Sequence, residues 1–155
     1  MGYDYLWNQV RVVGGAYGCF GSFGKNGRAS FASYRDPNLK RTLDIYDKAV
    51  EYLENFDVNE RDMTKYIIGT IATVDMPLTP QMKGNLATVL YLRGITQEDR
   101  QRQRDEILAA DANAIRALAP IVEACMKKDT YCVFGGEEKV RENEKIFSRV
   151  VRAME

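Results

Sequence analysis

The feature that most constrains this sequence is its segment 6–35, which reads LWNQVRVVGGAYGCFGSFGKNGRASFASYR. An apolar helical segment that carries Arg11 breaks at a Gly-Gly pair, and two runs of alternating aromatic and small residues follow it. Residues 24–27, between the runs, are Gly-Lys-Asn-Gly, and Asn-Gly is a strong hairpin signal because both residues tolerate positive φ. The segment predicts a helix end, a glycine joint and a β-hairpin, with Arg11 and Tyr17 on either side of the joint.

The rest of the chain predicts helices, because apolar residues recur at spacings of three and four. The predicted helices cover residues 39–53, 59–75, 79–93, 96–108 and 111–127, and a last one reaches Val150 with a break near Asn143. The predicted caps are Asp36, Asn59, Thr79, Thr96 and Asp111, and Pro120 is expected to kink its helix. Residues 130–134 are β-branched and aromatic, which predicts a third strand. We therefore expect an α+β fold in which helices pack on a small, mainly antiparallel sheet.

Length and charge narrow the class of protein. A chain of 155 residues is expected to form one domain that buries roughly 70% of its unfolded surface. Its 22 basic and 22 acidic residues cancel, which argues against a role driven by bulk charge on nucleic acid or membrane surfaces. No apolar run approaches the ~20 residues that span a bilayer, and the N-terminus has no secretory signal pattern.

The three cysteines, Cys19, Cys125 and Cys132, form no C-x-x-C pair and are odd in number. This pattern favours neither a metal site nor a disulfide framework. We expect buried free thiols in a reducing compartment.

Four motifs lie close together: LWNQVR at 6–11, GGAYG at 14–18, FASYRDPN at 31–38 and TLDIY at 42–46. Together they resemble the C-terminal part of the presequence-protease branch of the pitrilysin/insulinase-type zinc peptidases. A weaker match continues through the helices to VFGGEEKV at 133–140. The resemblance therefore covers most of the chain and implies a part of that family's α/β roll.

The resemblance implies roles for individual residues. In this family a His-x-x-Glu-His helix of a separate N-terminal domain holds the zinc, and the C-terminal half contributes an Arg and a Tyr, placed here at Arg11 and Tyr17. The Tyr is expected to donate to the developing oxyanion and the Arg to bind the substrate main chain, tasks that suit a phenol and a guanidinium fork. Gly14 and Gly15 have no Cβ, so a peptide backbone could approach them closely.

The chain departs from the family pattern in having no histidine. We therefore expect residues 1–155 to be the C-terminal portion of the last domain of a longer zinc metalloendopeptidase that degrades short, unstructured peptides. This portion is expected to be inactive alone and to hold no metal. Its expected partners are the zinc-bearing N-terminal half and peptide substrates, in a bacterial cytoplasm or an organelle matrix. With the earlier strands of the roll upstream, the hairpin would keep an open edge, through which a second copy is expected to pair.

Other interpretations stay open at this point. A noncatalytic scaffold is expected to lose the Arg or the Tyr, and a peptide-binding module would need the strands but not Arg11. Tyr34-Arg35-Asp36 is either a binding loop or a structural turn with a local Arg–Asp pair. The glycines before residue 22 fit neither phosphate-loop pattern. Asn8 and Gln9 lie one turn from Arg11 and could line the same cleft, although their type is more typical of a solvated helix face. The arginines between residues 93 and 104 are typical of such a face too.

Overall fold

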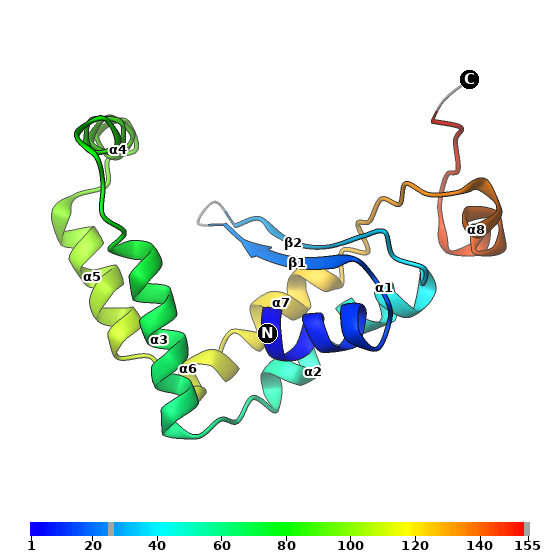
Figure 1. Ribbon diagram of the computed structural model, residues 1–155, viewed down its shortest axis with the longest axis horizontal. Helices are drawn as coiled ribbons and strands as arrows, with labels where there is room; N and C mark the ends of the chain where they lie inside the picture. Colours follow the sequence, from blue (N-terminus) through cyan, green and yellow to red (C-terminus); the bar gives the residue numbers. More distant parts are fainter. Residues whose placement is uncertain (25–26, 154–155) are drawn as a thin grey trace. The chain divides into compact units, whose positions relative to one another are not determined.

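The computed structural model describes residues 1–24 and 27–153, which form two compact units (Figure 1). The hairpin unit comprises Met1–Asn55 and Ala117–Glu155, and the helical unit comprises Phe56–Arg116. Length alone suggests a single domain, whereas the contacts divide the chain in two, because the helices between residues 56 and 116 pack mainly on one another.

The predicted hairpin is confirmed. β1 (Gly18–Phe23) and β2 (Ala29–Tyr34) run antiparallel, with Gly18 opposite Tyr34. Among the described residues each strand pairs only with the other, so the third strand expected at residues 130–134 is wrong. Pairing of a second copy along the hairpin edge stays a prediction.

The turn of the hairpin is described only in part. Gly27 donates its N–H to the Gly24 carbonyl at 3.0 Å, and Gly24 donates to the Arg28 carbonyl at 2.7 Å. Lys25 and Asn26 lie outside the described residues, and Asn26 is the first residue of the Asn-Gly signal.

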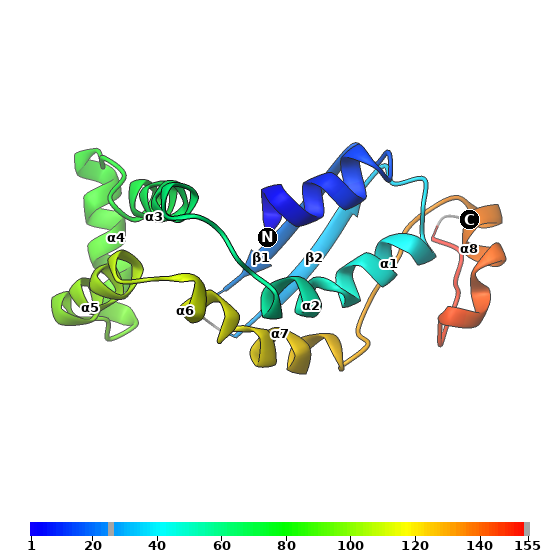
Figure 2. The same cartoon turned by 90° about the horizontal axis from the view of Figure 1, so that it is seen from below.

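The inner face of the hairpin packs on an N-terminal π-helix, η1 (Gly2–Val12). Leu6 and Val10 of η1 are fully buried. A Cβ at Gly21 of β1 would lie only 3.2 Å from the Leu6 side chain, so the missing side chain lets the helix approach the strand. Figure 2 shows η1 running along the hairpin.

Two helices, α1 (Lys40–Asp47) and α2 (Ala49–Glu54), replace the single helix predicted over residues 39–53, because the chain breaks at Lys48. The Tyr46 ring of α1 stacks on Phe31 of β2 with the ring centroids 5.4 Å apart. This contact joins α1 to the hairpin and extends the core that begins at Leu6.

The helix predicted from Asp111 to about residue 127 is also divided. α6 (Ala112–Arg116) belongs to the helical unit and α7 (Ala119–Met126) to the hairpin unit, where it packs on α2. Pro120 lies in the first turn of α7 and therefore does not kink a continuous helix.

The end of the chain is less helical than predicted. Residues 130–134 are irregular, because β propensity gives a strand only where a partner strand accepts its hydrogen bonds. α8 (Glu137–Glu142) breaks at Asn143 as predicted, but only the 3₁₀ turn η2 (Glu144–Ile146) follows it. The Tyr131 hydroxyl donates to the Ile146 carbonyl and links this turn to the irregular segment.

The helical unit follows the prediction closely at the start of each of its four helices. It contains α3 (Glu60–Val74), α4 (Pro80–Leu92), α5 (Gln97–Leu108) and α6. The side chains of Asn59, Thr79, Thr96 and Asp111 accept N–H bonds at the starts of these four helices, as predicted. Gly94, with φ 63°, follows the end of α4.

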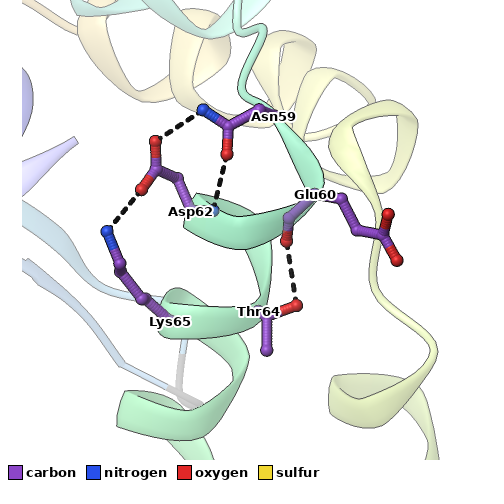
Figure 3. Close-up of polar contacts among 5 residues, drawn as sticks. All are labelled: Asn59, Glu60, Asp62, Thr64 and Lys65. Atoms are coloured by element: carbon purple, nitrogen blue, oxygen red, sulfur yellow. Dashed lines mark hydrogen bonds and ion pairs between the residues drawn. The ribbon is translucent and has the colours of Figure 1, made fainter.

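Figure 3 shows the start of α3. The Asn59 side chain accepts from the Asp62 N–H at 3.0 Å and donates to the Asp62 carboxylate at 2.9 Å. Lys65 donates to the same carboxylate at 2.6 Å. The hydrogen bond from Lys65, and to a smaller extent that from Asn59, lowers the pKa of Asp62. The cap is therefore strongest when Asp62 is ionised.

Two of the three arginines of α5 pair with acidic side chains, and Arg100 instead donates to the Gln97 side-chain oxygen at 3.4 Å. Arg102 pairs with Asp99 one turn earlier, and Arg104 pairs with Asp75 at the end of α3. These pairs agree with the expected solvated helix face. Among the described residues no helix is both long and apolar enough to span a bilayer.

Candidate functional site

Arg11 lies in the last turn of η1 and is held by an aromatic ring. Its guanidinium carbon lies 3.8 Å from the centroid of the Trp7 ring, one turn earlier. A cation at this distance from an indole face is stabilised by the ring quadrupole. The planar group therefore has a restrained direction, and Arg11 is half-buried. Asn8 donates instead to the Asp4 carbonyl within η1.

The glycine joint between Arg11 and Tyr17 is tightly held. Gly14 is buried, and a Cβ there would meet the Val10 carbonyl oxygen at 2.4 Å. Gly15 has φ 80°, a value that favours glycine, and donates its N–H to the Arg11 carbonyl at 2.8 Å. Both glycines are thus explained by local backbone geometry, and their role in substrate binding stays a prediction.

Tyr17 directly precedes β1 and points its ring to the surface. Its side chain is 66% exposed, and its hydroxyl has no hydrogen-bond partner among the described residues. Its backbone, in contrast, is fixed, because its N–H donates to the carbonyls of Tyr34 at 3.1 Å and Arg35 at 3.3 Å. The phenol is a free donor on a rigid support.

The turn after β2 lies against Tyr17, and sequence reasoning underestimated it. The Tyr34 ring meets the Tyr17 ring edge to face with centroids 5.9 Å apart. The Arg35 guanidinium lies 5.7 Å from the centre of the Tyr17 ring and 5.4 Å from that of Tyr34. No carboxylate pairs with Arg35 among the described residues, so the local Arg35–Asp36 pair, one of the two interpretations of this turn, is not formed.

The Asp36 carboxylate instead stabilises the turn through two hydrogen bonds. It accepts from the Asn38 N–H at 2.9 Å and from the Thr42 hydroxyl at 2.7 Å. Leu39, not Asp36, is the N-cap residue of α1, so the cap predicted at Asp36 is wrong. The Asn38 amide donates in turn to the Gly14 carbonyl, and this bond ties the turn after β2 to the glycine joint.

A groove lies beside the turn after β2. A groove of about 1020 Å³ runs between β2, α1, α7 and residues 129–136, and Tyr34 and Arg35 belong to its lining, whereas Arg11 and Tyr17 do not.

Burial raises the pKa of the Cys19 thiol, while the charge of Arg11 opposes the shift. The three thiols are free, as expected, but none is buried, because Cys19 and Cys125 are half-buried and Cys132 is exposed. The expectation of buried thiols is therefore wrong.

The described residues do not form a metal site. The chain has no histidine, and no group of three or more cysteine and carboxylate side chains in the described ranges is close enough to hold an ion. A free phenol and a ring-held guanidinium at one end of a helix-backed hairpin are instead suited to bind carbonyl or carboxylate oxygens.

The chain belongs to the presequence protease family, because residues 1–134 match the family model of the PreP C-terminal domain. It is 49% identical to Protein HypA of Clostridium perfringens over 97% of this chain and 15% of that protein. It is 41% identical to presequence protease 1, chloroplastic/mitochondrial, of Arabidopsis thaliana over 88% of this chain and 13% of that protein. The chain thus spans a small part of these relatives, and the predicted family is confirmed.

Proposed function

We propose that this chain supplies an oxyanion donor, Tyr17, and a substrate-binding residue, Arg11, to a zinc metalloendopeptidase. The observation that carries the proposal is the Tyr17 phenol, which is 66% exposed and has no partner among the described residues, while its backbone is held by β2. A donor fixed in advance costs little reorganisation when negative charge develops on a carbonyl oxygen. Such a contact strengthens in the transition state and so accelerates the reaction.

Each residue has a separate task in this proposal. The Tyr17 O–H donates to the oxygen that becomes negative when the scissile carbonyl is attacked. The Arg11 fork donates to a main-chain carbonyl or to the terminal carboxylate of the peptide, and its contact with Trp7 limits the entropy lost on binding. No reaction step is assigned to a metal within this chain, since its described residues do not fit one, and we propose that another part of the protein binds the zinc.

The names of relatives support the proposed substrate class. Relatives are named presequence proteases, which supports short, unstructured peptides as substrates. The relatives named chloroplastic or mitochondrial support work in an organelle matrix, and the Clostridium relative supports work in a bacterium.

The proposal is tested by combining this segment with a zinc-bearing N-terminal half. We call this combination the intact peptidase. We expect zinc-dependent cleavage of a quenched fluorescent peptide by the combination and none by residues 1–155 alone. A complex that forms but stays inactive with every metal tested would indicate a noncatalytic scaffold.

Replacing Arg11 by alanine is expected to raise KM of the intact peptidase about tenfold, because a hydrogen bond to a charged group contributes about 1.5 kcal/mol. The turnover number should change much less, since Arg11 is proposed to contact ground state and transition state alike. Steady-state kinetics with peptides of several lengths measure both constants. Arg41→Ala, at an exposed position of α1, is the control, and peptide binding that is unchanged in Arg11→Ala would favour a binding module that uses only the strands.

A further inference from the structure

Arg35 has an unusual backbone for its residue type. Its φ is 48°, in the left-handed region that side chains other than glycine, asparagine and aspartate rarely enter. Such a conformation persists only where surrounding contacts hold it, and it is often found at functional sites. Here the Arg35 carbonyl accepts the Tyr17 N–H at 3.3 Å, and Asp36 is tied to Asn38 and Thr42.

The side chain of Arg35 is committed to two rings. Its guanidinium lies within 6 Å of both the Tyr17 and the Tyr34 ring centres, which is the range of a cation–π contact. Asp36 is adjacent in sequence, yet it accepts from Asn38 and Thr42 and does not pair with Arg35. The cation therefore acts on the rings.

The Tyr17 ring has few other restraints. It is 66% exposed, its hydroxyl is free of described partners, and the Tyr34 ring touches it edge to face. A ring that is mostly exposed can turn about its first side-chain bond and carry the hydroxyl away. The Arg35 guanidinium opposes this motion, because turning the ring would lose the cation–π contact.

We propose that Arg35 is a positioning residue, which aims the Tyr17 phenol by holding its ring. This inference rests on the proposed function of Tyr17 as an oxyanion donor. Arg35 does not itself contact substrate in this proposal. The left-handed backbone conformation of Arg35 directs its side chain back toward the Tyr17 and Tyr34 rings.

The test is Arg35→Gly in the intact peptidase. Glycine accepts the left-handed backbone, so stability against urea should be unchanged or higher while the guanidinium is lost. A misplacement of a catalytic group by ~1 Å can cost about 10²-fold in rate. We expect a smaller displacement of the phenol here, which should lower kcat about tenfold and change KM less than about twofold. Arg35→Lys, which keeps a cation, should recover part of the loss. Asp129→Gly is the matched control, because Asp129 is the other described non-glycine residue with positive φ, at 46°. The intact peptidase with Asp129→Gly should have an unchanged kcat.

A double-mutant cycle with Tyr17→Phe separates positioning from other roles. If Arg35 acts through the phenol, Arg35→Gly should change kcat less than about twofold once the hydroxyl is gone. An equal loss in both backgrounds, or a rise confined to KM, would overturn the inference and indicate direct contact with substrate. A large effect of Tyr17→Phe with none from Arg35→Gly would overturn only the inference, whereas no effect of Tyr17→Phe would overturn the proposed function and the inference with it.

Discussion

Replacing Tyr17 by phenylalanine is expected to lower kcat of the intact peptidase by about 10²–10³, with little change in KM. The magnitude is that of removing one oxyanion donor, equivalent to about 2.7–4 kcal/mol of transition-state stabilisation. The change removes a single hydroxyl and keeps the ring that Tyr34 and Arg35 contact. Single-turnover and steady-state cleavage of a quenched peptide measure the loss.

Stability provides the control for this prediction. The Tyr17 side chain is 66% exposed, and its hydroxyl has no partner among the described residues, so its loss should change the free energy of unfolding by less than about 0.5 kcal/mol. Tyr91→Phe is the matched variant, since Tyr91 is 85% exposed in the helical unit, and it should have normal kinetics. An effect of Tyr17→Phe confined to KM would contradict the oxyanion role and assign the phenol to ground-state binding.

Features specified by neighbouring residues were predictable from the sequence. The hairpin follows from alternation, and the helix starts at Asn59, Thr79 and Thr96 follow from side chains that accept bonds within three residues. Arg11 and Tyr17 could be singled out because the surrounding motifs resemble a known family. Taken alone, an arginine on a helix and a tyrosine beside a strand carry no such signal.

Features that depend on contacts between distant segments were not predictable. Asn38 reaches back to the Gly14 carbonyl, and the guanidinium of Arg35 turns to Tyr17 instead of to adjacent Asp36. In sequence both look like members of an ordinary polar turn. The strand predicted at residues 130–134 was wrong for a related reason, because a β-prone segment becomes a strand only beside a partner strand. The positive φ of Arg35 has no sequence signal at all, because arginine does not favour it.

Gly14 illustrates how a site residue can be explained by either function or fold, and Gly14→Ala separates the two. A Cβ at this position would lie 2.4 Å from the Val10 carbonyl oxygen and 3.1 Å from that of Gln9. Both neighbours are backbone atoms of η1, which cannot move without disturbing the helix that carries Arg11. We expect a loss of about 3 kcal/mol in the free energy of unfolding, at the upper end of overpacking effects. Urea unfolding followed by circular dichroism measures it.

Gly15→Ala and Gly69→Ala are the matched controls for this loss. A Cβ at Gly15 would meet only Pro37 at 3.7 Å, so its cost is that of φ 80°, about 1 kcal/mol. Gly69 is exposed within α3 with open space around it, and alanine there should stabilise the helix by about 0.5–1 kcal/mol. If Gly14→Ala proves as stable as Gly15→Ala but the intact peptidase loses peptide affinity, packing does not explain Gly14. Glycine would then be required there because a substrate backbone passes close to it.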